Sequence, residues 1–381
     1  MKNPVSNTKS AVDRRSFMKS GLLAGGAAAV GAGLLANGTS ARADERESRG
    51  RLNPGDAAIL RFLAAAELLE SDLWVQYAEL GGIGNDQPIE INPNPNPPLN
   101  PYQMALSALD GDGPQYITSN TLDEVSHAAF LNAYLESRGA APVDFSEFET
   151  LKGSTALGLG GKKRLTNLMH LNVDTSWYVR YRSTGNPDSG ETFPQAITFN
   201  NVSAIPVSDA DLNNSNPNHM QAVANTAAFH FGMIEQGGTS LYATLSQKVS
   251  DPEVLKITLG IGGDEIAHFL EWVDFAGNGV QQPVAPFTDT VSGLTFPDFF
   301  NNPPLQPANL VQPSLIFPVP CEFISPNLPH VAIIRPLTDK FSGAQAAVAS
   351  LTADGLFVGQ SQRFLKTLQI MAIEADEAFR R

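Results

Sequence analysis

The sequence feature that most constrains the fold is a five-residue string that occurs twice, Asp-Glu-Val-Ser-His at 123–127 and Asp-Glu-Ile-Ala-His at 264–268. With 18 Glu and 6 His in 381 residues, chance predicts roughly 0.3 Glu-x-x-His pairs, and on the order of 0.01–0.02 when Asp must precede Glu. Glu and His three residues apart lie on one face of a helix, about one turn apart. The repeat therefore predicts two helices that each present a Glu/His pair to a shared site.

Residues 1–43 have the features of an export signal. Arg14 and Arg15 precede a mildly apolar run over 21–36, and Ala-Arg-Ala at 41–43 forms a small-x-small cleavage site. The apolar run is shorter than the about 20 residues that a membrane span needs. The segment resembles a twin-arginine signal peptide, which implies a periplasmic or secreted protein that is exported already folded, with no stable membrane insertion after cleavage.

The chain that remains after this cleavage is strongly acidic. Removing residues 1–43 changes the formal net charge from −14 to −19. Such a charge disfavours nucleic acid as a partner. The acidity is better explained by a gain in solubility than by attraction of cations. The single Cys321 excludes an intrachain disulfide, so stability must come from core burial, with any metal adding to it.

Four long helices are predicted, because apolar residues recur at three- and four-residue steps over 56–80, 114 or 121 to 138, 217–248 and 251–275. Asp56 is expected to cap the first helix and Asp251 the fourth, with Pro252 at the first helical position. Three glycines within 260–263 each cost the fourth helix about 1 kcal/mol relative to Ala. Close packing or a π-bulge would justify them, and a plain break in the helix is the alternative.

The predicted fold class is therefore all-α, a four-helix bundle over 55–277. Two insertions interrupt it, at 83–113, which includes an Asn/Pro-rich loop, and at 140–215, which forms a long irregular excursion between the halves. Apolar spacing predicts an accessory helix over 162–181 within that excursion.

Residues 278–381 are predicted to form a C-terminal extension. Most of it is Pro-rich with little periodicity, which indicates an irregular wrap over the bundle, and it ends in an amphipathic helix at about 359–379. The acidic residues Glu374, Asp376 and Glu377 in this helix are expected to form a solvated face.

A second repeat supplies partners for the two Glu/His pairs. Aligning Tyr-Ala-Glu-Leu at 77–80 with Tyr-Ala-Thr-Leu at 242–245 gives an offset of 165 residues, and this offset places Glu70 on Glu235. Glu67, one turn before Glu70, competes for the same role. The same offset places a glycine, which cannot bind metal through a side chain, opposite Glu67, so Glu70 is preferred.

Four carboxylates in one bundle core are costly without a cation. They carry a charge of −4, which two divalent ions neutralise, and without metal they would have to protonate. Mixed carboxylate and imidazole ligands suit iron or manganese more than zinc. The predicted metal ligands are Glu70, Glu124, His127, Glu235, Glu265 and His268.

This ligand set over residues 55–277 resembles the ferritin-like superfamily, specifically the ferritin-like domain group that includes the desiccation-related proteins. The resemblance implies two Fe or two Mn ions. It also implies terminal ligands at Glu70 and Glu235, bridging ligands at Glu124 and Glu265, and His127 and His268 each capping one ion. Asp123 would hydrogen-bond His268, and Asp264 would hydrogen-bond His127.

Two tyrosines follow the terminal glutamates by seven residues, on the same helix face. Tyr77 and Tyr242 are candidates for a redox or supporting role at the site, and core packing with one hydroxyl hydrogen bond is an equal alternative. Every other histidine and all three tryptophans are assigned to structure: His170, His219, His230, His330, Trp74, Trp177 and Trp272.

Two functions from different classes follow. The first is an oxidoreductase that uses a metal pair to act on Fe(II), O₂ or peroxide. The second is a desiccation- or stress-associated structural protein in which the metals only stabilise the bundle. A homo-oligomer is possible, but a 24-subunit storage cage is disfavoured because the large insertions would obstruct it.

Overall fold

The structure is a computed structural model that describes residues 50–83, 98–175, 177, 198–278, 286–296, 318–319, 327, 331–332 and 343–378. The predicted signal peptide and much of the predicted wrap lie outside these residues. The described part contains eight α-helices and four short two-stranded sheets, which confirms the all-α class. Within the described part, no helix combines the length and the hydropathy that a membrane span requires.

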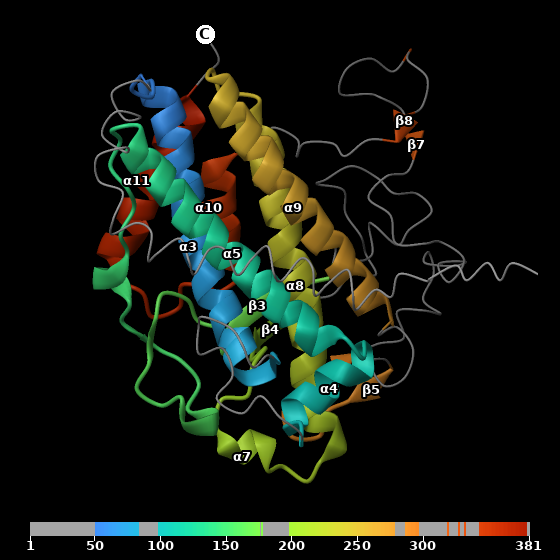
Figure 1. Cartoon of the computed structure of the whole chain (residues 1–381). Coiled ribbons are helices and arrows are strands. Elements are labelled where there is room, and N and C mark those ends of the chain that lie inside the picture. Colours follow the sequence, from blue (N-terminus) through green and yellow to red (C-terminus); the bar gives the residue numbers. More distant parts are fainter. Residues whose placement is uncertain are drawn as a thin grey trace, which may run out of the picture. The chain divides into compact units, whose positions relative to one another are not determined.

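Four long helices lie side by side and form the bundle (Figure 1). They are α3 (Pro54–Gly81), α5 (Gly113–Ser137), α8 (Pro217–Ser246) and α9 (Pro252–Asn278). The main packing partner of α3 is α5, and that of α8 is α9. Each half of the sequence repeat is thus one helix pair, and their apolar faces join in a single buried core.

The helix starts show which cap residues the sequence uses. Asn53, not Asp56, caps α3: its Oδ1 accepts a hydrogen bond from Asp56 N at 2.9 Å, and Pro54 follows at the first helical position. The Asp56 carboxylate instead accepts from the backbone N–H groups of Ser250 (2.8 Å) and Asp251 (2.9 Å), which joins the start of α3 to the α8–α9 turn. At α9 the predicted cap is confirmed, since Asp251 Oδ1 accepts from Glu253 N at 2.7 Å.

The glycines of α9 do not break it, because the helix is continuous from Pro252 to Asn278. A Cβ on Gly262 would lie 2.8 Å from Tyr242 Cβ, so a side chain there would prevent the close approach of α8 and α9. Gly260 and Gly263 have open space at the Cβ position. Close packing therefore explains Gly262, and the structure gives no packing reason for the other two.

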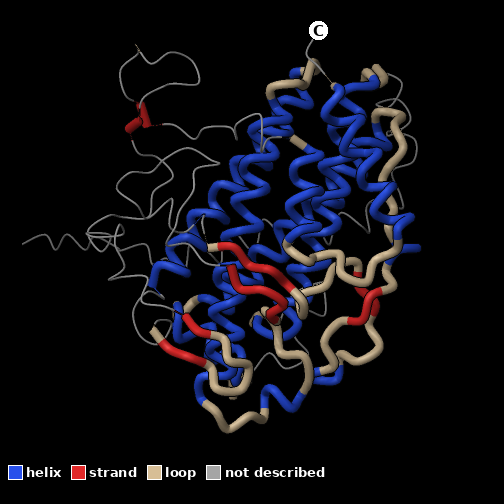
Figure 2. Tube along the Cα trace, turned by 180° about the vertical axis from the view of Figure 1, so that it is seen from behind, coloured by secondary structure: helices blue, strands red, loops and turns tan. Residues whose placement is uncertain are grey.

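The two insertions contain short elements. The first holds α4 (Pro101–Leu109), and the second holds η1 (Ser146–Phe148), β1 (Leu151–Lys152), η2 (Ala156–Gly158), β2 (Lys163–Arg164), β3 (Leu171–Asp174), β4 (Thr198–Val202) and α7 (Asp209–Leu212). The strands gather at one end of the bundle (Figure 2). The accessory helix predicted over 162–181 is wrong over 163–174, where β2 and β3 lie, whereas Trp177 is helical. In β3, buried Leu171 and Val173 alternate with half-buried residues, which is the period of a strand.

An ion-pair cluster attaches the second insertion to α3. Glu79, at the end of α3, is buried and pairs with Arg164 and with Lys162, the latter at 2.5 Å. A buried carboxylate requires such partners. The contact holds β2 against the bundle.

The C-terminal extension adds two helices, α10 (Ala344–Ala353) and α11 (Gln362–Glu377). The second was predicted and the first was not. α11 packs on α3, and α10 packs on α11 and α8. Asp376 does not simply face solvent, because its carboxylate caps α10 by accepting from Ala344 N (2.8 Å) and Gln345 N (2.9 Å). Glu374 is exposed and pairs with Arg61.

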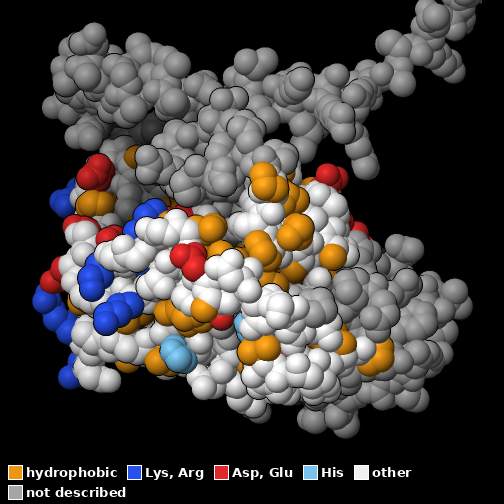
Figure 3. Space-filling view, turned by 90° about the horizontal axis from the view of Figure 1, so that it is seen from below, with side chains coloured by type: hydrophobic (Ala, Val, Ile, Leu, Met, Phe, Trp, Pro, Cys, Tyr) orange, Lys and Arg blue, Asp and Glu red, His pale blue; other side chains and the backbone are white. Residues whose placement is uncertain are grey.

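The remaining strands form two small hairpins, β5 (Phe287–Thr288) with β6 (Thr295–Phe296), and β7 (Pro318–Val319) with β8 (Val331–Ala332). The face seen in Figure 3 mixes apolar and charged side chains, with Lys and Arg gathered toward one edge. The acidic composition of the chain therefore does not produce a uniformly acidic surface there.

Candidate metal centre

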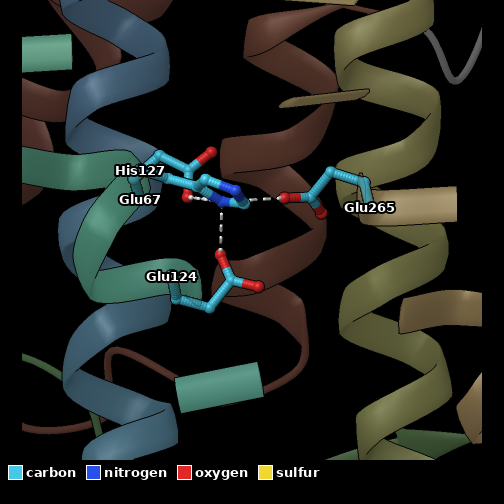
Figure 4. A group of neighbouring side chains, drawn as sticks. All are labelled: Glu67, Glu124, His127 and Glu265. Atoms are coloured by element: carbon cyan, nitrogen blue, oxygen red, sulfur yellow. Dashed lines mark hydrogen bonds and ion pairs between the residues drawn. The ribbon is translucent and has the colours of Figure 1, made fainter. Parts of the chain in front are cut away.

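The first half of the candidate site is a group of four buried side chains from three helices. Glu67 comes from α3, Glu124 and His127 from α5, and Glu265 from α9, and one ligand atom of each lies within 4.8 Å of the others (Figure 4). His127 Nδ1 is 3.3 Å from Glu67 Oε2 and 3.2 Å from Glu124 Oε2. The Glu and His side chains of the α5 pair thus point to one shared site, as their three-residue spacing predicts.

The second half has the same composition and uses the remaining helix. Glu235 from α8 and His268 from α9 join Glu124 and Glu265, again with ligand atoms within 4.8 Å. His268 Nδ1 is 3.0 Å from Glu124 Oε1 and 3.5 Å from Glu235 Oε2. Glu124 and Glu265 belong to both groups, which is the position that ligands shared by two ions must occupy.

Both histidines have a carboxylate behind them. His127 Nε2 lies 3.1 Å from Asp264 Oδ2, and His268 Nε2 lies 3.4 Å from Asp123 Oδ2. These are the contacts expected from the sequence. A carboxylate that accepts a hydrogen bond from Nε2–H fixes the proton there and leaves Nδ1, which faces the glutamates, able to bind a metal.

The two halves are related by an offset that differs from the one read in the sequence. Ser71 Oγ on α3 donates to the backbone oxygen of Glu124 at 3.1 Å, and Thr239 Oγ1 on α8 donates to that of Glu265 at 3.2 Å. These equivalent contacts place position 71 on position 239, an offset of 168 residues. The same offset places Glu67 on Glu235 and Glu70 on Gly238.

Glu70 therefore occupies a different place from Glu235. It belongs to neither of the two ligand groups, although it lies near enough to interact electrostatically with Glu67, Glu124 and Glu235. Glu70 is half-buried because it lines a cavity beside the site. The alignment of two Tyr-Ala-x-Leu strings favoured Glu70, whereas the spatial equivalence favours Glu67.

The buried negative charge of the cluster shifts the pKa values of its members. Burial, the charge of Glu124 and that of Glu70 raise the pKa of Glu265 well above its usual range. Burial raises the pKa of Glu67 to about 7, although its contact with His127 acts to lower it. Burial alone would lower the pKa of His127, but its contacts with Asp264, Glu124 and Glu67 raise it to about 12. Protons thus balance part of the buried negative charge.

Several buried carboxylate oxygens are also left without a hydrogen bond within the described part of the chain. Both carboxylate oxygens of Glu265 lack a hydrogen bond, and so do Oε2 of Glu67 and Oε2 of Glu235. The Glu67 and Glu235 atoms lie within ion-pair distance of a histidine. Buried polar atoms without partners are costly, and metal ions would satisfy these atoms. The residues could therefore hold metal ions.

Asn120 is a site residue that the sequence analysis missed. It is fully buried, and its Nδ2 donates to Glu124 Oε1 (2.8 Å) and Glu235 Oε1 (3.3 Å), while its Oδ1 accepts from Trp272 Nε1 (2.7 Å). It lies one turn before Glu124 on the same helix face, which is a signal the sequence contained. Asn120 therefore orients carboxylates from both halves of the site.

The two candidate tyrosines have different surroundings. The Tyr242 hydroxyl donates to Glu67 Oε1 and so contacts the cluster directly. Tyr77 pairs with His230 instead, 2.7 Å from hydroxyl oxygen to Nδ1, and its ring packs against Trp74. Burial lowers the pKa of His230 to about 3, so this histidine is neutral.

The remaining histidines that the structure describes lie apart from the cluster. His170 contacts Asn201, and His219 lies between Asp289 (3.0 Å) and Asp211 (3.4 Å). His330 lies outside the described residues. The three tryptophans are all buried, as expected.

Gly238 provides a local test of the site's packing. A Cβ at this position would lie 2.0 Å from Glu265 Oε2, which is closer than any real contact. We expect Gly238→Ala to displace the Glu265 carboxylate and to weaken metal binding at least tenfold, as judged by metal titration. Gly237→Ala is the matched control, because its Cβ would meet open space. Equal metal affinity in the two variants would contradict the geometry.

Comparisons with protein-family models, with curated proteins and with solved structures found no match. The helical bundle and its buried Glu/His cluster are compatible with a ferritin-like fold. The functional argument therefore depends on the geometry of this chain's own residues.

Proposed function

We propose that this protein is an exported oxidoreductase with a dimetal carboxylate centre, iron or manganese, that acts on Fe(II), O₂ or peroxide. The observation that supports it is the pair of buried Glu/His groups that share Glu124 and Glu265. A buried carboxylate and imidazole set of this kind suits iron or manganese.

The proposed roles follow from position in the cluster. Glu67 and His127 would hold one ion and Glu235 and His268 the other, with Glu124 and Glu265 available to both. The ions, when bound, would supply the capacity to change oxidation state. The Tyr242 hydroxyl donates a hydrogen bond to one carboxylate oxygen of Glu67. Asp264 faces the Nε2 atom of His127, and Asp123 faces that of His268.

A turnover assay tests this function against a purely structural role. We expect the metal-loaded protein to oxidise added Fe(II) with O₂ or H₂O₂ over many cycles, and Glu124→Ala to lose this activity while its helical circular dichroism is retained. A protein that binds two ions per chain but shows no turnover with either oxidant would instead support a stress-associated structural protein whose metals hold the four helices together.

A further inference from the structure

A cavity of about 60 Å³ lies beside the metal centre, between α3, α8 and the C-terminal helices. Its walls are almost entirely apolar, and they include Phe62, Leu241, Val348, Leu351 and Leu368. Protein interiors are close-packed, so a void of this size in the bundle is unusual. At about 10–15 Å³ for each water-sized group, it has room for about four to six non-hydrogen atoms.

The cavity reaches the metal centre at two points. Glu70 lines it and interacts electrostatically with Glu67, Glu124 and Glu235 of the ligand groups. Gly238 also lines it, and the Glu265 carboxylate lies directly against this glycine. Because Gly238 has no side chain, only its backbone separates the cavity from a carboxylate that both groups share.

The other side of the site has the opposite character. Asp123 on α5 and Asp264 on α9 stand behind the histidines with side chains 49% and 43% exposed. Hydrated cations are suited to such a polar side and are poorly suited to an apolar cavity. The two approaches to the centre therefore fit different kinds of molecule.

We propose that the cavity binds a small aliphatic molecule with one polar end group, such as a short-chain alcohol, whose polar end lies at Glu70 beside the metal pair. This inference rests on the proposed function, to which it adds an organic substrate class. The apolar walls take up the hydrocarbon part. Glu70, the polar lining residue that interacts with the ligand groups, fixes its direction, as polar groups do in small-molecule sites generally. The C-terminal extension forms part of the site, because Ala347 and Val348 of α10 close the cavity.

Xenon and butan-1-ol are suitable probes, since apolar cavities bind xenon and butan-1-ol has five non-hydrogen atoms. In crystals of the full chain we expect xenon in the cavity, and after a butan-1-ol soak we expect the hydroxyl at Glu70. Ala347→Leu should fill the cavity and weaken butan-1-ol binding at least tenfold in ligand-observed NMR. Ala349→Leu is the matched control, because Ala349 is exposed on the same helix and does not line the cavity.

The outcomes separate this inference from the proposed function. An empty cavity in the wild-type protein, or equal butan-1-ol binding by Ala347→Leu and Ala349→Leu, would overturn the inference even if the protein bound two metal ions. A butan-1-ol hydroxyl at Ser350 or Asp354, the other polar residues that line the cavity, would overturn the proposed orientation. Probe binding in a chain that takes up no iron or manganese would leave the cavity as a binding site and overturn the proposed function.

Discussion

Glu265→Ala is expected to reduce the bound metal from two ions per chain to fewer than one, because Glu265 belongs to both ligand groups. Glu67→Ala and Glu235→Ala should each lose one ion and keep the other, since each residue belongs to a single group. Metal analysis after equilibration with excess Mn(II) and gel filtration measures these stoichiometries. Manganese avoids oxidation during the measurement.

The same series decides between the two candidates on α3. If Glu67 is the ligand, Glu70→Ala keeps two ions, whereas Glu67→Ala keeps one. The opposite result would restore the assignment that the sequence alignment favours. If all four variants retained two ions, these carboxylates would not be the ligands.

Stability should depend on pH in opposite directions with and without metal. In the metal-free protein the pKa of Glu67 is raised from 4.5 to about 7. The stability contributed by its protonated form is therefore fully present below pH 4.5 and is lost as the pH rises through 7. By the relation between pKa shift and free energy, this amounts to about 3 kcal/mol.

The histidines act in the same direction at higher pH. The pKa of His127 is raised from 6.5 to about 12, so its contribution is fully present below pH 6.5 and declines as the pH rises above that value. The pKa of His268 is raised as well, because the charge of Glu235 and contacts with Asp123 and Glu124 outweigh burial, which would lower it. The metal-free protein should thus lose stability continuously from about pH 5 to pH 9.

Metal binding reverses this trend, because the ligands must be deprotonated to bind. Bound metal stabilises a fold by about 4 kcal/mol when its concentration is a thousandfold above the dissociation constant. Thermal unfolding between pH 5 and pH 9, in EDTA and in Mn(II), should give a Tm that falls with pH in EDTA and rises in Mn(II). Parallel curves would show that the cluster does not bind the ion.

The sequence was most informative where one local rule decided the outcome. Glu124 with His127 and Glu265 with His268 are three residues apart, so helix geometry alone places each pair on one face. The four long helices followed from apolar spacing in the same way. Secondary structure in the insertion was harder to predict, because Met169, Val173 and Trp177 recur at four-residue steps, as in a helix. Only pairing with β4 selects the strand at Val173.

The α3 ligand was ambiguous for a related reason. Glu67 and Glu70 are one turn apart, and a repeat alignment based on Tyr-Ala-x-Leu strings differs from the spatial offset by about that turn. Helix α10 and the cavity it closes were beyond sequence analysis, because contacts between distant segments create them. The role of Asn120 likewise depends on Glu235 and Trp272 arriving from other helices.

The sequence by itself thus determined the helical class and the duplicated Glu/His pairs that could hold a metal ion, since each follows from residue type and spacing along one helix. The tertiary structure decided which glutamate of α3 meets His127, how Glu124 and Glu265 come to be shared, and where an apolar cavity adjoins them. The physical reason is that these features depend on how four helices rotate and shift against one another. Close packing at glycines such as Gly238 and Gly262 fixes that arrangement.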